Sequence, residues 1–150
     1  MTKNQTELTY LRAAVQNASP AGLVILLYDL LINDLECAIA AIAKNNVEER
    51  SKQLKHAFLV IEKLQGTLNM EEGGEAARRL SKFYSVLRSN IMGGHAKASA
   101  EILEGQIKLL LQVRGAWAQV DRPVQSAYGS VSADSDDETP NRTRLETCSA

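Results

Sequence analysis

The stretch of the chain that decides its fold runs from Tyr10 to Leu35 and reads YLRAAVQNASPAGLVILLYDLLINDL. Ser19 and Pro20 mark a helix start within it. A serine oxygen can accept a hydrogen bond from the first helical turn, and a proline at the first helical position loses no bond. From Pro20 onward the chain is apolar with few interruptions. The sequence therefore predicts a long apolar helix over residues 20–44.

This predicted helix is apolar over more of its circumference than one packing contact requires. At about 100° per residue, Asp29, Asn33 and Glu36 share one polar face. The apolar residues fill an arc roughly twice the 100° width that is typical of a surface helix. We therefore expect this helix to lie at the centre of its domain, or to be covered by another segment or a partner.

Three further amphipathic segments follow the first helix, and short turns separate them. Apolar residues recur every three or four positions in each, over residues 47–69, 74–92 and 96–120. Asn45–Asn46 and Gly93–Gly94 are expected to break the helices, since these residue types suit tight reversals. Four helices of similar length with short connections predict an all-α fold, an antiparallel four-helix bundle over residues 20–120.

Residues 1–19 precede the bundle and form a short N-terminal cap segment. Leu8, Tyr10, Leu11 and Val15 are spaced for one side of a short helix. Such a helix is too short to be stable in water by itself. We therefore expect it to lie on the bundle through these four side chains.

Residues 121–150 differ in composition from the bundle. Ser, Asp, Thr and Asn dominate, with an acidic centre at 134–138. So few apolar residues cannot offset the entropy of ordering the segment. The sequence predicts a disordered acidic C-terminal tail.

Composition excludes several functional classes. The net charge of −1 over 150 residues argues against nucleic-acid binding, which needs a basic excess. No apolar run is long enough to span a bilayer, so no membrane insertion is expected. The polar N-terminus does not resemble a signal peptide. We expect a cytoplasmic protein.

Residue patterns that carry catalysis or metal binding are missing from the sequence. Neither His56 nor His95 has a glutamate three residues earlier, as a di-iron bundle would need. A phosphotransfer histidine stays open as an alternative, but Leu59 and Val60 follow His56 where a basic and a small residue would be needed. We expect no enzyme activity, no cofactor and no metal.

Four blocks of sequence, in order, resemble the flagellar secretion chaperones of the FliS family. Together they cover roughly residues 10–119. The blocks are Tyr10-x4-Val15-x2-Ala18-Ser19-Pro20-x2-Leu23-x3-Leu27-Tyr28-Asp29, then Gly73-Gly74-Glu75, Leu80-x3-Tyr84 and Arg114-Gly115-Ala116-Trp117.

The resemblance implies a helical bundle that binds the C-terminal segment of flagellin in the cytoplasm. It further implies that binding prevents premature polymerisation, and that the chaperone delivers the subunit to the flagellar export gate. The alternative is a helical adaptor for a different secretion or regulatory protein. In either case the excess apolar surface would hold an amphipathic segment of the partner.

The expected partner-binding residues come from both ends of the bundle sequence. Tyr10 and Val15 would form a mobile cover for an empty groove. The groove itself is predicted at Leu23, Leu27, Leu110, Val113 and Trp117.

Overall fold

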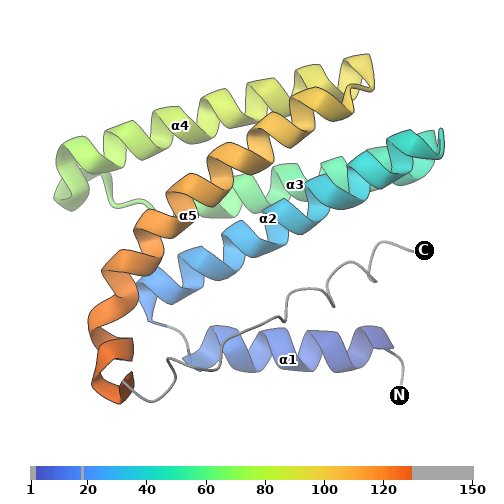
Figure 1. Cartoon of the computed structure of the whole chain (residues 1–150). Helices are drawn as coiled ribbons and strands as arrows, with labels where there is room; N and C mark the ends of the chain where they lie inside the picture. The colour runs from blue at the N-terminus through green and yellow to red at the C-terminus, as the bar shows by residue number, and fades with distance from the viewer. Residues whose placement is uncertain (1–2, 18, 130–150) are drawn as a thin grey trace.

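The computed structural model contains five helices and, among the residues it describes, no strand. It describes residues 3–17 and 19–129, with 121–129 described by their backbone alone. Figure 1 shows the helices in chain order. They are α1 (Lys3–Asn17), α2 (Pro20–Ala43), α3 (Val47–Gly66), α4 (Met70–Lys97) and α5 (Ala100–Gly129).

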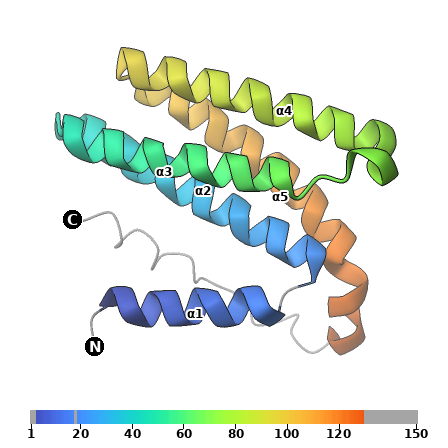
Figure 2. The ribbon, with the colours of Figure 1, turned by 180° about the vertical axis from the view of Figure 1, so that it is seen from behind.

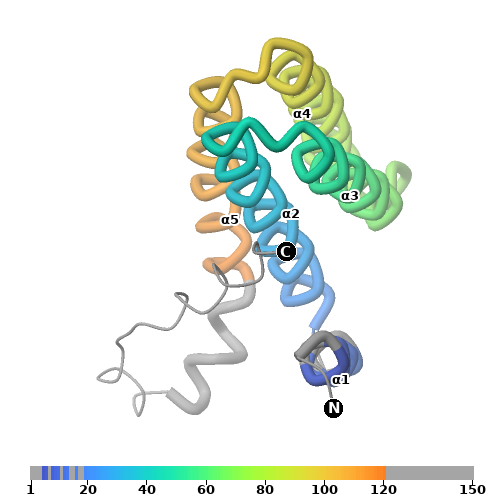
Figure 3. Tube along the Cα trace, turned by 90° about the vertical axis from the view of Figure 1, so that its right-hand side faces the viewer, coloured from blue at the N-terminus to red at the C-terminus, as the bar shows by residue number. Residues whose placement is uncertain are grey.

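Helices α2 to α5 form the predicted antiparallel four-helix bundle. α2 packs against α3 and α5, and α4 packs against the same two helices. α2 and α4 therefore occupy diagonal corners, as Figure 3 shows in an end-on view. The largest fully buried side chains come from all four helices: Tyr28, Leu31, Leu35, Leu54, Ile61, Leu64, Tyr84, Leu87, Ile91, Leu103 and Leu110.

The predicted start of α2 is confirmed, and so is the reversal after it. The Ser19 hydroxyl accepts a hydrogen bond from the Gly22 amide at 2.9 Å, and Pro20 opens the helix. Asn45 adopts a φ of 56°, the left-handed conformation that suits asparagine. The Asn46 side chain then caps α3 by accepting from the Glu49 amide.

The predicted break at Gly93–Gly94 is wrong, because α4 continues through both glycines to Lys97. A Cβ atom on Gly94 would lie 2.8 Å from the Leu103 side chain. Gly94 therefore serves close packing between α4 and α5. The reversal occurs instead at Ala98, which has a φ of 49°.

The two ends of the chain also differ from the prediction. α5 continues beyond Val120 to Gly129, through Pro123. The rest of the predicted disordered tail, 130–150, lies outside the described residues.

α1 forms a helix of its own beside the bundle (Figure 2). Its expected burial is wrong for Leu8 and Tyr10, whose side chains are 58% and 67% exposed. Leu8 and Tyr10 therefore contribute little to the packing of α1 on the bundle. The side chains of Leu11 and Val15 lie outside the described residues.

A buried hydrogen bond links the diagonal helices at the centre of the bundle. The hydroxyl groups of Tyr28 and Tyr84 lie 2.9 Å apart, and both residues are 0% exposed. Burial raises the pKa of both phenols, and hydrogen bonds from Tyr84 and Trp117 oppose the rise at Tyr28. Trp117 of α5 therefore lies close to the Tyr28 hydroxyl at the same centre.

Two further polar pairs tie α2 to its neighbours. Arg114 of α5 binds the Asp29 carboxylate with two parallel hydrogen bonds, of 2.6 and 3.1 Å. His56 of α3 lies 2.6 Å from the carboxylate of Asp34, whose side chain is 6% exposed. These contacts fix the position of α2 relative to both adjacent helices.

Replacing Tyr84 with phenylalanine should lower the free energy of unfolding by about 1–3 kcal/mol, because the buried Tyr28 hydroxyl loses its partner. Tyr28→Phe should have a similar effect. The double variant should cost less than the sum of the two single changes. Urea denaturation of the four proteins measures the coupling, and strictly additive costs would contradict a direct bond.

Stability should fall as the pH rises through the folded-state pKa of His56. The hydrogen bond to Asp34 raises that pKa above 6.5, so folding favours the protonated imidazole. Burial raises the pKa of Asp34 above 3.8, which also makes stability decline with rising pH, but in a more acidic range.

Urea denaturation at several pH values above 6.5 should show this loss. His56→Gln keeps a donor for Asp34 but cannot titrate, so it should flatten the slope. An unchanged slope in this variant would assign the dependence to other groups.

Candidate partner-binding surface

The outer edge of the α4–α5 contact carries several exposed apolar side chains. Asn90 of α4 donates a hydrogen bond to Gln106 of α5 at 3.2 Å, which identifies the flanks that the two helices turn toward each other. Beside this bond lie Val86 and Leu109, with exposures of 48% and 40%. Val120 continues the surface along α5 and is 64% exposed.

We call this surface the α4–α5 strip, formed by Phe83, Val86, Ile102, Leu109, Val113 and Val120. Phe83 and Val113 are partly buried and pack against the core from the strip. Their positions follow from helical periodicity, which places residues three or four apart on one face. The strip is long enough to accompany several turns of a partner helix.

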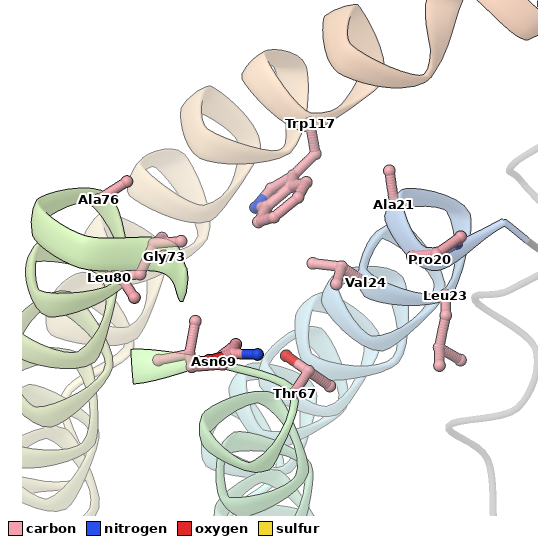
Figure 4. Close-up of a pocket in the computed structure, with 12 residues that line it drawn as sticks. Pro20, Ala21, Leu23, Val24, Thr67, Asn69, Gly73, Ala76, Leu80 and Trp117 are labelled. Atoms are coloured by element: carbon pink, nitrogen blue, oxygen red, sulfur yellow. The ribbon is translucent and has the colours of Figure 1, made fainter. Parts of the chain in front are cut away.

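A cavity of about 340 Å³ opens at the end of the bundle where α2 begins. Figure 4 shows side chains from four elements around it. They are Leu23 and Val24 of α2, Thr67 and Asn69 of the α3–α4 turn, Gly73, Ala76 and Leu80 of α4, and Trp117 of α5. Trp117 extends into the space from the opposite side to Thr67. The cavity therefore forms only when these four elements pack together, and no single helix contains all of its lining residues.

Two glycines shape the α4 side of this cavity. Gly74 has a φ of 54° and a ψ of −129°, which kinks α4 after its first turn. A Cβ atom on Gly73 would lie 2.6 Å from that of Ala77. The kink thus brings the first turn of α4 over the cavity, where a side chain at either glycine would disturb the backbone.

The structure places the predicted groove residues in three different environments. Leu23 and Trp117 line the cavity. Val113 lies on the α4–α5 strip, one turn before Trp117. Leu27 is partly buried against the core, and Leu110 is fully buried in it. Leu110 therefore supports the strip from beneath and does not face a partner in this conformation.

The predicted cover residues belong to α1. Tyr10 is exposed and is not among the residues that line the cavity. Every α1 side chain whose burial the structure describes is exposed. These side chains therefore bury little surface against the bundle.

The described residues form no site for a metal ion. No three of their His, Cys, Asp or Glu side chains gather where they could share one. No helix in the same part of the chain has the length and apolar character needed to cross a bilayer.

Comparison with known families matches residues 2–124 to the family model described as flagellar protein FliS. The chain belongs to the FliS family. The match covers α2, α3, α4 and α5 as far as residue 124, including the strip, the cavity and the Gly73–Gly74 kink. It confirms the resemblance seen in the four sequence blocks.

Three relatives in this family carry the name flagellar secretion chaperone. The FliS protein of Vibrio cholerae is 28% identical over 103 residues, which is 69% of this chain and 76% of the relative. That of Salmonella typhimurium is 28% identical over 109 residues, 72% and 81% of the two chains. The FliSB protein of Pseudomonas aeruginosa is 26% identical over 113 residues, 75% and 90% of the two chains.

Sequence reasoning did not select several residues that form the exposed surface. Phe83, Val86 and Leu109 belong to the α4–α5 strip but were not predicted as binding residues. The available signal was the excess apolar width of residues 74–92 and 96–120. A wide apolar face shows that a helix has apolar residues on both sides of its buried face. It does not show which of the two sides a neighbouring helix covers.

Gly74→Ala should lower the free energy of unfolding by about 1–3 kcal/mol, because alanine is strained in this backbone conformation. Gly115→Ala is the matched control. Gly115 lies in regular helix, and a Cβ atom added there would meet nothing within 4 Å, so alanine should raise stability by up to about 1 kcal/mol. Thermal and urea denaturation measure both variants, and equal effects would contradict a specific role for the kink.

Proposed function

We propose that this chain is a cytoplasmic flagellar export chaperone that binds the C-terminal segment of flagellin. Binding would prevent premature polymerisation, and the chaperone would deliver the subunit to the flagellar export apparatus. Membership of the FliS family supports the flagellar role, and the names of the three relatives support secretion chaperoning.

The exposed α4–α5 strip is the observation that carries the proposal. An amphipathic helix can lay its apolar face along such a surface, with anchors three or four residues apart. Val86 and Leu109 lose exposed apolar area when a partner helix covers them, which is favourable by about 25 cal/mol per Å². The strip thus provides the binding energy, and the neutral Asn90–Gln106 pair beside it adds no charge that must be desolvated.

Chaperoning would follow from coupled folding and binding. A disordered client segment loses conformational entropy when it becomes helical, at a cost of several kcal/mol. An extended interface is needed to offset this cost. While the segment occupies the strip, its apolar face is unavailable to other client subunits, and polymerisation is blocked.

α1 provides a candidate cover for the empty surface. Tyr10 and Val15 would contact the bundle when no client is bound and move away when one arrives. Tyr10 and the other described α1 side chains are exposed in this conformation, so covering the surface would require α1 to move onto it.

Calorimetric titration with a peptide of the C-terminal region of flagellin from the source organism tests the proposal. One-to-one binding with a negative heat-capacity change is expected. Val86→Asp and Leu109→Asp should each weaken binding by about tenfold or more, because the client would have to desolvate a carboxylate.

Leu59→Asp is the matched control for both variants. Leu59 is 53% exposed on α3, away from the α4–α5 strip, so this change should leave the affinity within about twofold. A wild-type protein that is folded but shows no heat of binding at several temperatures would disprove flagellin binding. Equal weakening by all three variants would disprove the assignment to the strip.

A further inference from the structure

The cavity at the end of the bundle differs from the strip in being concave. Its volume of about 340 Å³ lies at the lower end of the range for ligand pockets, roughly 300–1,000 Å³. It is about twice the volume of a protein cavity of roughly 150 Å³ that holds a benzene ring. The space is therefore sufficient for two large apolar side chains.

Two polar groups at the cavity, the Thr67 hydroxyl and the Asn69 side-chain oxygen, are engaged within the chain. The Thr67 hydroxyl donates to the Leu64 carbonyl at 2.7 Å. The Asn69 side-chain oxygen accepts from the amides of Glu71 and Glu72. A polar ligand would find few partners here, whereas an apolar group fits the remaining walls.

The α4–α5 strip leads directly into this cavity. Leu80 precedes Phe83 by about one turn on α4, and Trp117 follows Val113 by about one turn on α5. Leu80 and Trp117 line the cavity, while Phe83 and Val113 belong to the strip. A helix that lies along the strip therefore brings the side chains at one of its ends to the cavity mouth.

From this continuity and volume, we infer that the cavity is an anchor site for two large apolar side chains, one helical turn apart, at one end of the client helix. The inference rests on the proposed function, and it adds that one end of the client helix lies at the cavity. The strip holds the client along its length, and the cavity fixes its register, because only a suitably placed apolar pair can enter.

The position of Trp117 makes the site directly measurable. Trp117 is the single tryptophan of the chain, and it is partly buried in the cavity wall. Filling the cavity removes water from its indole ring. A flagellin C-terminal peptide that lacks tryptophan should therefore shift the Trp117 emission to shorter wavelength as it binds.

Ala76→Phe is designed to fill the cavity from α4 and should weaken peptide binding by about tenfold. Lys55→Phe is the matched control, since Lys55 is exposed on α3, outside the cavity lining and away from the α4–α5 strip. It should leave the affinity within about twofold. Ala21→Leu fills the cavity from α2 and gives a second test if Ala76→Phe fails to fold, which circular dichroism would show.

Toluene provides a probe that does not depend on the client. It should shift the Trp117 emission of the wild-type protein but not that of Ala76→Phe. If toluene has no effect on the wild type, the anchor site is disproved even when the peptide binds. If the peptide binds by calorimetry, with no emission change and equal affinity for the cavity variants, the anchor site is disproved while the proposed function stands.

Two further outcomes would also decide against the anchor site. A peptide that does not bind the folded wild type would overturn both the proposed function and the client anchor. An emission shift that depends on protein concentration alone would show that a second copy of the chain fills the cavity.

Discussion

The hydrogen bond between Tyr28 and Tyr84 is the constraint on which the bundle depends. Both phenols are buried at its centre, where a hydroxyl without a partner is costly. The bond joins diagonal helices that otherwise pack mainly on their neighbours, so it aligns α2 with α4 along their length. Trp117 of α5 lies close to the same pair and also lines the cavity, so the centre of the bundle adjoins the cavity wall.

The polar pairs around this centre explain why the apolar surface lies at α4–α5. Among the described residues, a charged or ionisable side chain crosses each of the other three helix contacts: Asp34–His56 between α2 and α3, Asp29–Arg114 between α2 and α5, and Arg50–His95 between α3 and α4. The α4–α5 contact has the neutral Asn90–Gln106 pair instead. A partner helix can therefore approach this contact without breaking an ion pair between α4 and α5.

Local chemistry was sufficient to predict the start of α2 and the bundle, but it could not predict where α4 ends. Ser19–Pro20 and Asn45–Asn46 act through their own backbone and capping bonds, which the sequence displays directly. Gly93–Gly94 has the composition of a turn and forms helix, because Leu103 packs closely against Gly94. That contact depends on how two helices meet, whereas helix propensity describes each residue alone.

The same limit applies to the candidate site. Periodicity predicted excess apolar surface on residues 96–120, and Leu109, Leu111 and Val120 are exposed there. The binding role of Val113 and Trp117 stays a prediction. Leu110 was also expected to bind the partner. It belongs to the same apolar face of α5 but lies at the centre of that face, where it is fully buried. The residues best placed to meet a partner are on the flank of such a face, and neighbouring helices decide which flank is covered. The cavity is a further example. Part of its lining comes from the turn after α3 and from the kink at Gly74, and the periodicity of one helix predicts neither.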